Sequence, residues 1–233
     1  MKKIFLTVAL VVGAMYANAQ VITEQEFARK MGELSNKRDA LWKGDNWMSG
    51  GFDDANAKLY IQYSMEACAL MEKYTNQLTD GNEQIDLLWM QTDVLSDALD
   101  VYCKNRVGLS EAEYGVQFRR MVAALNRILT ISKRIDDKQT HLQVAFDVKR
   151  ELGEQYFKCK KYQDAFDNYK SCITSYQEYT NLYGADADIR KLGQEAYYYC
   201  GYSAYKLGNT AVANHYFNKA KEISNDSLIQ PYK

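Results

Sequence analysis

Apolar residues recur at every third or fourth position along most of the chain. Between residues 110 and 136, for example, Met121, Leu125 and Ile128 are separated by polar and basic side chains such as Arg127. This spacing is typical of an α-helix that buries one face. No stretch shows the sustained alternation of apolar and polar residues that a half-buried strand requires. The pattern therefore predicts an all-α fold.

Start and stop signals divide the chain into eight predicted helices. Capping-box sequences at residues 23–26 and 110–113 are typical of helix N-termini. Glycines that follow amphipathic runs are expected to end helices in a left-handed conformation, and they are Gly44, Gly81, Gly108, Gly184 and Gly208. The predicted helices span residues 23–43, 53–79, 82–106, 110–136, 139–159, 162–183, 186–207 and 210–225.

Short turns between long helices require successive helices to lie antiparallel. Eight helices then form either four hairpins stacked side by side or a bundle. The single proline, Pro231, lies almost at the end of the chain, so the helices are free of the residue that most often breaks them. Residues 44–52 are predicted to form an ordered loop, and the polar residues 226–233 a C-terminal tail.

The first 19 residues have the pattern of a cleaved signal peptide. Lys2 and Lys3 precede an apolar stretch at 4–13, which is too short to span a bilayer, and a small-x-small cleavage site ends at Ala19. Cleavage there would leave Gln20 as the first residue of an exported protein, either periplasmic or secreted. No later apolar run is long enough to cross a membrane, so we expect no transmembrane segment.

The charge balance gives no indication of a nucleic-acid partner. The full chain has a formal net charge of −1, and removal of residues 1–19 takes away two lysines and no acidic residue. A slightly acidic protein lacks the polybasic surface on which nucleic-acid binding depends. One local group of basic residues is interpreted as a solvated helix face; it consists of Arg119, Arg120, Arg127, Lys133 and Arg134.

The cysteines give no signal of a redox or zinc motif. There are five of them, Cys68, Cys103, Cys159, Cys172 and Cys200, and no two have C-x-x-C spacing. An odd number leaves at least one thiol unpaired in a monomer. Because all five lie in helical, apolar contexts, we expect buried thiols that behave as small apolar side chains, although export would permit one disulfide.

The C-terminal third contains two similar segments that carry a recognisable motif. In each, a glycine in one predicted helix is followed by an alanine and an aromatic residue in the next. The first segment has Leu152, Gly153, Tyr156, Ala165, Tyr169 and Cys172, and the second has Cys200, Gly201, Ala204, Ala213, Phe217 and Ala220 at the same relative positions. Both segments resemble the tetratricopeptide (TPR) repeat. The two glycines are 48 positions apart, compared with about 34 in that family, so these are stretched repeats.

The resemblance implies a division of the chain and a packing scheme. Residues 20–136 would form N-terminal helical hairpins, and residues 137–225 two TPR-like hairpins. Gly153 and Gly201 would allow the two helices of a hairpin to approach closely. Tyr169 and Phe217 would fill the space between hairpins.

The resemblance also implies a binding face for a protein or peptide partner. TPR units bind partners on the concave surface formed by the first helix of each hairpin. The residues assigned to this surface are Arg150, Glu154, Phe157, Lys158, Tyr198, Tyr202, Tyr205 and Lys206. Glu154 and Tyr202 stand where the family's carboxylate-binding members have asparagine, so that specialised function is not expected. The alternative interpretation of the tyrosines is internal packing, since aromatic stripes at helical spacing usually lie in a core.

We find no set of residues that predicts catalysis, a metal or a cofactor. His141 and His215 belong to no metal motif, and the calcium-loop-like start at Asp186 and Asp188 lacks the required glycine at Lys191. The leading hypothesis is a non-enzymatic interaction scaffold of the cell envelope or extracellular space. The alternative is a glycan-binding protein or envelope enzyme with an aromatic and acidic cleft that uses Trp42, Trp47 and Trp89. A third is a structural subunit of a homo-oligomer.

Overall fold

The computed structural model describes residues 21–41 and 52–223, and these residues form eight α-helices. The helices are α2 (Glu24–Asp39), α3 (Asp54–Thr75), α4 (Gly81–Asn105), α5 (Glu111–Ser132), α6 (Lys138–Lys158), α7 (Tyr162–Tyr183), α8 (Ala187–Lys206) and α9 (Thr210–Ile223). The predicted signal peptide (1–19), Trp42, most of the predicted loop (44–52) including Trp47, and the C-terminal tail (226–233) lie outside the described residues.

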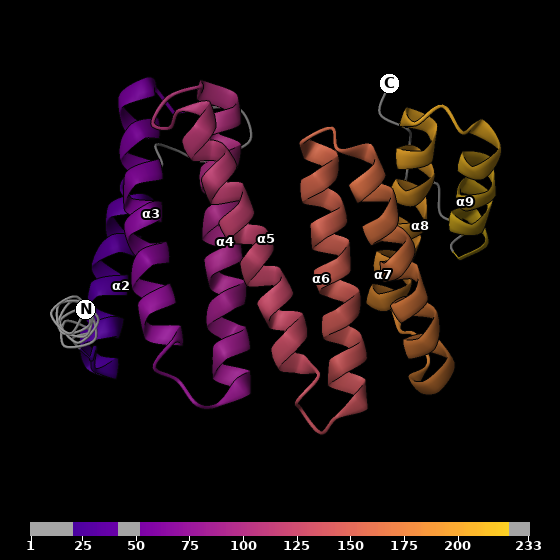
Figure 1. Cartoon of the computed structure of the whole chain (residues 1–233), viewed down its shortest axis with the longest axis horizontal. Coiled ribbons are helices and arrows are strands. Elements are labelled where there is room, and N and C mark those ends of the chain that lie inside the picture. The colour runs from indigo at the N-terminus through magenta and orange to yellow at the C-terminus, as the bar shows by residue number, and fades with distance from the viewer. Residues whose placement is uncertain (1–20, 42–51, 224–233) are drawn as a thin grey trace, which may run out of the picture.

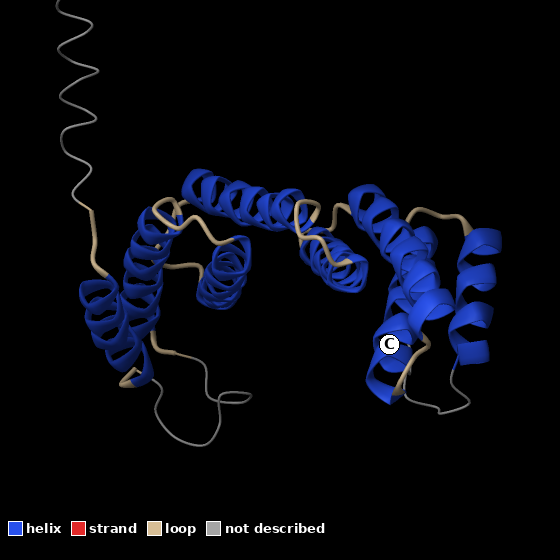
Figure 2. Ribbon diagram, turned by 90° about the horizontal axis from the view of Figure 1, so that it is seen from below, coloured by secondary structure: helices blue, strands red, loops and turns tan. Residues whose placement is uncertain are grey.

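The helices form an array of antiparallel hairpins, as the sequence predicts, and no strand occurs among the described residues. Successive helices lie side by side from α2 at one end to α9 at the other (Figure 1). Viewed along the helices, the array is an arch, with α5 on the outer side and α4 and α6 on the inner side (Figure 2). The prediction of an all-α, TPR-like array is therefore confirmed.

Side-chain caps begin most of the helices. The Ser110 hydroxyl accepts a hydrogen bond from the Glu113 backbone N–H at 3.2 Å, and the Glu113 carboxylate accepts one from the Ser110 N–H at 2.7 Å, which completes the predicted capping box. Aspartates at 53, 80, 137 and 186 cap four further helices, because each side chain accepts a hydrogen bond from a backbone N–H in the first turn. Helix α7 differs, because Lys161 at its N-cap provides no side-chain hydrogen bond.

The predicted helix ends are partly confirmed. Gly184 and Gly208 have φ values of 80° and 81° at the ends of α7 and α8, as expected of residues that terminate helices. Gly81, by contrast, is the first residue of α4 rather than the end of α3, because Asp80 caps the helix in front of it. Helix α4 ends at Arg106, which adopts the left-handed conformation two residues before Gly108.

The hairpins α2–α3 and α4–α5 enclose an aliphatic core. Its centre consists of fully buried Met71, Leu95, Met121, Leu125 and Ile128, which come from α3, α4 and α5. Val148 and Leu152 of α6 extend this core toward the next hairpin. The residues are those of the period-3.6 stripe, so burial of these stripes accounts for the packing of this half.

The hairpins α6–α7 and α8–α9 pack around aromatic rings placed against glycines. A Cβ atom at Gly153 would lie 2.9 Å from the Tyr169 ring, and one at Gly201 would lie 2.9 Å from the Phe217 ring. The close approach expected from these glycines is confirmed. Each ring packs on the glycine of its own hairpin, and the expectation that it fills the space between hairpins is confirmed for Tyr169. Tyr169 additionally stacks on Tyr199 of α8, with ring centroids 5.7 Å apart.

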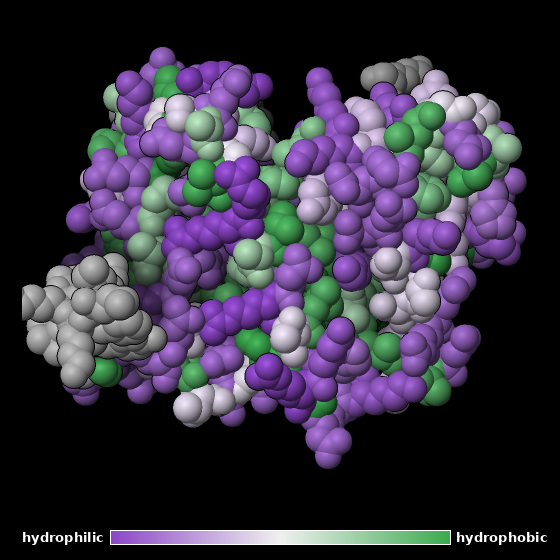
Figure 3. Space-filling model, viewed as in Figure 1, coloured by the Kyte–Doolittle hydropathy of each residue, from purple (hydrophilic) through white to green (hydrophobic). Residues whose placement is uncertain are grey.

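Helices α5 and α6 join the two halves and diverge from their shared turn. The turn between them lies at one end of the array, and the opposite ends of the two helices are apart (Figure 1). The space-filling view from the same side shows a hollow between the two halves, with apolar residues at its base (Figure 3). The array thus has an inner face on α4, α6 and α8 and an outer hollow between α5 and α6.

Candidate binding face

The first helices of three successive hairpins are linked by their side chains into one surface. Between α4 and α6, the amide Nε2 of Gln155 donates hydrogen bonds to Ser96 Oγ at 2.9 Å and to Glu151 Oε1 at 2.7 Å. Lys158 Nζ lies 3.4 Å from the Asp100 carboxylate on α4 and 3.1 Å from the Glu154 carboxylate on its own helix. We call this surface, on α4, α6 and α8, the inner face.

Aromatic rings continue the inner face from α6 to α8. The Phe157 ring centroid lies 5.1 Å from that of Tyr202 and 5.8 Å from that of Tyr199. Tyr202 in turn stacks on Tyr205 at 6.4 Å, and the Lys206 ammonium lies 4.9 Å from the centre of the Tyr202 ring. The hairpins therefore meet through rings that both cross the inter-helix space and reach the surface.

The predicted tyrosine stripe is divided between core and surface. Tyr198 is 5% exposed and packs near Phe217, so for this residue the internal-packing interpretation is confirmed. Tyr202 is half-buried, whereas Tyr205 is 56% exposed. The stripe thus presents an aromatic surface only toward the C-terminal end of α8.

The charged residues predicted for the face lie on the same side of α6. Arg150 Nη1 is 3.7 Å from the Glu154 carboxylate, which is a long contact for an ion pair. The buried Nε of Arg150 has no hydrogen-bond acceptor among the described residues. Burial lowers the pKa of Lys158, but the Glu154 and Asp100 carboxylates outweigh that effect and raise it overall. The Lys158 ammonium is accordingly held in its charged form.

Sequence reasoning did not identify the contribution of α4 to this face. Asp93, Asp97 and Asp100 are spaced by four and three residues, so they lie on one side of the helix. Burial and the nearby Glu151 carboxylate raise the pKa of Asp93, and burial raises that of Asp97 against the opposing effect of Arg38. Asp93 and Asp100 lie near Glu151 and Lys158 of α6, whereas Asp97 lies 3.7 Å from Arg38 of α2 and 3.5 Å from the Tyr60 hydroxyl of α3. The spacing alone could have placed the three carboxylates on one side of α4.

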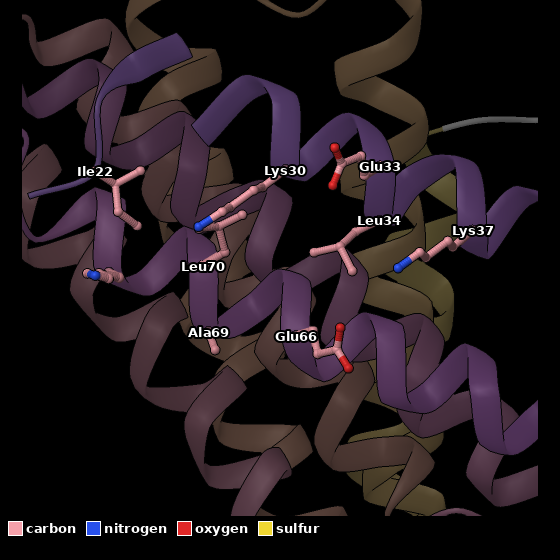
Figure 4. Close-up of a pocket in the computed structure, with 9 residues that line it drawn as sticks. Ile22, Lys30, Glu33, Leu34, Lys37, Glu66, Ala69 and Leu70 are labelled. Carbon is pink, nitrogen blue, oxygen red and sulfur yellow. The ribbon is translucent and has the colours of Figure 1, made fainter. Parts of the chain in front are cut away.

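A second concave feature lies between α2 and α3, at the N-terminal end of the array. It is a groove of about 440 Å³ in which Lys30, Glu33 and Lys37 of α2 face Glu66 and Leu70 of α3 (Figure 4). Lys30 is already paired with Glu26 at 2.7 Å. The mixture of charges and the small apolar area indicate a hydrated surface groove rather than a site for chemistry.

The remaining candidate residues do not converge on a reaction centre. Within residues 21–41 and 52–223, no three His, Cys, Asp or Glu side chains are grouped closely enough to hold a metal ion. His141 bonds to Ser132 at 3.1 Å and His215 is exposed on α9. Trp89 packs against the aliphatic core, so it offers no sugar-stacking surface together with another tryptophan in the described residues.

All five cysteines are free thiols. The expectation of burial is confirmed for Cys68, Cys172 and Cys200, and burial raises the pKa of Cys68 and of Cys200 to about 12. It is wrong for Cys103, which is exposed at the end of α4, and Cys159 is half-buried. In the part of the chain that the structure describes, no helix combines the length and apolarity needed to cross a bilayer.

Comparisons with known proteins leave the family open. No established protein family matches the sequence, and no curated protein matches it either. Among solved structures, BtubC (BKLC) from P. vanneervenii is similar at a TM-score of 0.40 and 14% sequence identity, over 89% of this chain and 95% of BtubC. The MamA protein is similar at a TM-score of 0.29 and 14% identity, over 88% of this chain and all of MamA. Likenesses at this level carry no argument about function.

Proposed function

We propose that this protein is a non-enzymatic scaffold that binds a protein or peptide partner on its inner face. The observation that carries the proposal is a pair of side-chain contact series that meet at consecutive residues of α6. Lys158 contacts Asp100 of α4, and Phe157 contacts Tyr202 of α8, which in turn stacks on Tyr205. These contacts hold aromatic and charged groups of three hairpins in fixed positions along one surface. Tyrosines of this kind provide rigid apolar area with a polar end, which suits protein interfaces.

The charge of the inner face indicates the kind of segment that would fit. Four carboxylates, those of Asp93, Asp100, Glu151 and Glu154, lie on the same part of α4 and α6 as the two basic groups of Lys158 and Arg150. The exposed ring of Tyr205 can receive an apolar side chain or a cation. An extended segment that carries lysine or arginine next to apolar residues is therefore the expected partner chemistry.

We further propose that the protein acts after export, in the periplasm or outside the cell. The support is the sequence pattern of the first 19 residues. Expression of the full chain in a bacterial host, followed by N-terminal sequencing of the mature form, tests this. Gln20 as the first residue of a periplasmic or secreted product is the expected result. A product that retains Met1 in the cytoplasm would contradict the proposal.

The scaffold proposal predicts that a partner is lost when the exposed end of the tyrosine stripe is removed. A tagged double variant, Tyr202→Ala with Tyr205→Ala, is compared with the wild type in pull-downs from envelope extract. The matched control is Tyr183→Ala, because Tyr183 is a 43% exposed tyrosine at the end of α7 and makes no contact with the inner-face series.

The expected result is a specific partner that the wild type and Tyr183→Ala recover and the double variant does not. Recovery of the same partner by all three proteins would exclude this part of the inner face as the binding surface. Absence of any partner that the wild type enriches would contradict the scaffold function itself. Circular dichroism of each variant confirms that a lost partner reflects a lost surface and not unfolding.

A further inference from the structure

The hollow between α5 and α6 contains a defined cavity. The proposed scaffold function does not require this cavity. The cavity has a volume of about 600 Å³. It is bounded by the first half of α5, the C-terminal end of α6 and the residue that ends α4, Arg106. Its size lies within the range of cavities that hold small organic molecules. We call it the α5/α6 cavity.

The lining of the α5/α6 cavity carries charge of one sign. Five basic side chains contribute to it, Arg106, Arg119, Lys158, Lys160 and Lys161, and no aspartate or glutamate does. The chain as a whole has a formal net charge of −1, so this concentration of cations is not a reflection of overall composition. A concave surface with a single sign of charge focuses the field and attracts the opposite charge.

Most of this positive charge is not neutralised nearby. Lys158 is paired with Asp100 and Glu154 on the inner-face side. The other four cations take part in no ion pair within the described residues. Among the carboxylates beyond the lining, Asp164 on α7 is near enough to help raise the pKa of Tyr156, after the larger effect of burial. Four cations consequently line the cavity without an ion-pair partner among the described residues.

The inner part of the cavity is aromatic. The rings of Tyr114, Phe118 and Tyr156 form a continuous cluster, with centroids 6.5 Å apart for Tyr114 and Phe118 and 5.6 Å apart for Phe118 and Tyr156. The Lys161 ammonium lies 5.4 Å from the Phe118 ring and 5.9 Å from the Tyr156 ring. The cavity therefore combines a flat apolar wall with cations at its edge.

Helix-end electrostatics explains only part of this arrangement. Basic residues are favoured at helix C-termini because they interact well with the helix dipole. Arg106 lies at the C-terminal end of α4 and Lys160 at that of α6. Both have φ of 58°, and within residues 21–41 and 52–223 they are the only residues other than glycine with positive φ. Arg119 lies in the first half of α5, away from any C-terminus, so the dipole of its own helix does not account for it. What the basic side chains share is therefore their place in the lining of the cavity, and not a common position in their helices.

Gly115 keeps the α5 wall of the cavity open. A Cβ atom at Gly115 would meet only Arg119 within 4 Å, at 3.5 Å from its Nη1. The glycine is thus not required by close helix packing, unlike Gly153 or Gly201, where a Cβ would meet an aromatic ring. A longer side chain at this position would project toward the space that Arg119 borders.

We propose that the α5/α6 cavity binds a small organic anion that has an aromatic or similarly flat apolar body and one carboxylate, sulfonate or phosphate group. The apolar body packs on Tyr114, Phe118 and Tyr156, and the anionic group pairs with Arg119 and Lys161. Arginine is suited to such a group because its planar guanidinium can donate two parallel hydrogen bonds. Of the residues that line the cavity, Lys158 also belongs to the inner face, whereas Arg119, Lys161 and the three rings do not.

The test is a nuclear magnetic resonance titration of the ¹⁵N-labelled protein with phenyl phosphate, inorganic phosphate and benzylamine. Phenyl phosphate is expected to shift the amides of Gly115, Tyr156 and Lys160 in a saturable way. Inorganic phosphate, which lacks the ring, should bind about tenfold more weakly at the same amides. Benzylamine, which has the ring and a positive charge, should not bind. Equal shifts with benzylamine, or shifts by phenyl phosphate that do not saturate, would overturn the proposal.

Two kinds of variant test separately whether binding depends on the positive charge of the lining and on the open volume of the cavity. Arg119→Gln with Lys161→Gln should weaken phenyl phosphate binding by about tenfold or more, since two charge-assisted contacts are lost. Gly115→Leu should block the cavity with every cation retained. Lys170→Gln, an exposed lysine on α7, is the matched control and should leave binding unchanged. If either the Arg119→Gln/Lys161→Gln variant or Gly115→Leu binds phenyl phosphate as tightly as the wild type, the ligand binds elsewhere and the proposal is wrong.

Discussion

The two halves of the array have the same hairpin architecture but are packed differently. In the N-terminal half (α2–α5), interdigitated aliphatic side chains such as Leu95, Leu125 and Ile128 fill the space between helices. In the C-terminal half (α6–α9), aromatic rings lie flat against glycines, as Tyr169 does on Gly153. The aliphatic half depends on total apolar volume, and the aromatic half on a pairing of particular residues.

Substitution of glycines provides a way to measure this difference in packing between the two halves. A Cβ atom at Gly193 in the C-terminal half would lie 2.3 Å from the Tyr176 ring, which is far too close. A Cβ atom at Gly32 in the N-terminal half would meet nothing within 4 Å. The same substitution is therefore expected to have opposite effects in the two halves.

The largest effect is expected from removal of a ring in the aromatic half. Tyr169→Ala should lower the free energy of unfolding by about 3–5 kcal/mol, because the ring is almost fully buried between Gly153 and Tyr199. In the aliphatic half, Leu125→Met preserves apolar volume and should cost about 1.5 kcal/mol or less. Urea denaturation measures both. A loss below about 1.5 kcal/mol for Tyr169→Ala would contradict the tight seating of the ring, and a loss above about 3 kcal/mol for Leu125→Met would contradict the tolerance of the aliphatic half.

Glycine replacement should give the next largest effect and a change of sign. Gly193→Ala is expected to lower the free energy of unfolding by about 1–3 kcal/mol, since the overlap with Tyr176 exceeds the gain in helix propensity. Gly32→Ala should raise it by about 0.5–1 kcal/mol, because the new methyl group meets open space. Thermal and urea unfolding of the pair test this. Stabilisation by both substitutions would show that the Gly193 contact is not tight.

A half-buried carboxyl in the aromatic half, that of Asp147, predicts a pH dependence. Burial raises the pKa of Asp147 from 3.8 to about 6, against a smaller opposing effect of Arg150. The fold thus favours the protonated carboxyl, so this contribution to stability is fully present below the ordinary pKa and is lost as pH rises through about 6. Asp147→Asn should stabilise the protein by about 1–2 kcal/mol at neutral pH and by little at pH values below 4.

Urea titrations of wild type and Asp147→Asn at several pH values measure this difference. A stabilisation that is the same in acid and at neutral pH would assign the effect to something other than ionisation. Destabilisation at neutral pH would indicate that the Asp147 carboxylate is charged and favourably paired in the fold.

The smallest expected effects concern two helix starts, the capped start of α5 in one half and the uncapped start of α7 in the other. Ser110→Ala removes one side of the α5 capping box and should cost about 1 kcal/mol. Helix α7 has no side-chain cap, so Lys161→Ser should stabilise the protein by about 0.5–1 kcal/mol and also weaken anion binding in the α5/α6 cavity. Thermal unfolding with and without phenyl phosphate distinguishes the two effects of Lys161→Ser. A loss of stability in that variant would contradict the account of α7.

Most of the fold could be predicted from the sequence because helix signals are local. Period-3.6 stripes, capping residues such as Ser110 and the short turns located all eight helices of the described residues, with ends that differ by a few positions. Gly81 was misassigned because a glycine between two helices is compatible with either the end of one or the start of the next. Asp80, one residue before it, was the stronger signal.

Less of the candidate surfaces could be predicted, because they combine distant segments. The motif placed Phe157, Tyr202 and Tyr205 on one face, but the acidic side of α4 became apparent only when α4 and α6 were seen to touch. The division of the tyrosine stripe depends on Phe217 of α9, which buries Tyr198 and leaves Tyr205 exposed. Sequence spacing assigns residues to a side of a helix and does not say what covers that side.

The α5/α6 cavity was not predicted from the sequence at all. Its cations come from three separate segments, represented by Arg106, Arg119 and Lys161. Arg119 was interpreted as part of a solvated basic face of one helix, which is the usual reading of such a group. Only the divergence of α5 from α6 brings these segments around a common space (Figure 1).

The central claim is that partners bind on the inner face and not on the outer side of the arch. A photo-crosslinking amino acid at position 205, on α8, tests this directly against the same residue at position 116, where Val116 is 50% exposed on the outer helix α5. After irradiation in envelope extract, the account predicts a discrete crosslinked product from position 205 and none from position 116. Products of equal yield from both positions, or from position 116 alone, would contradict it.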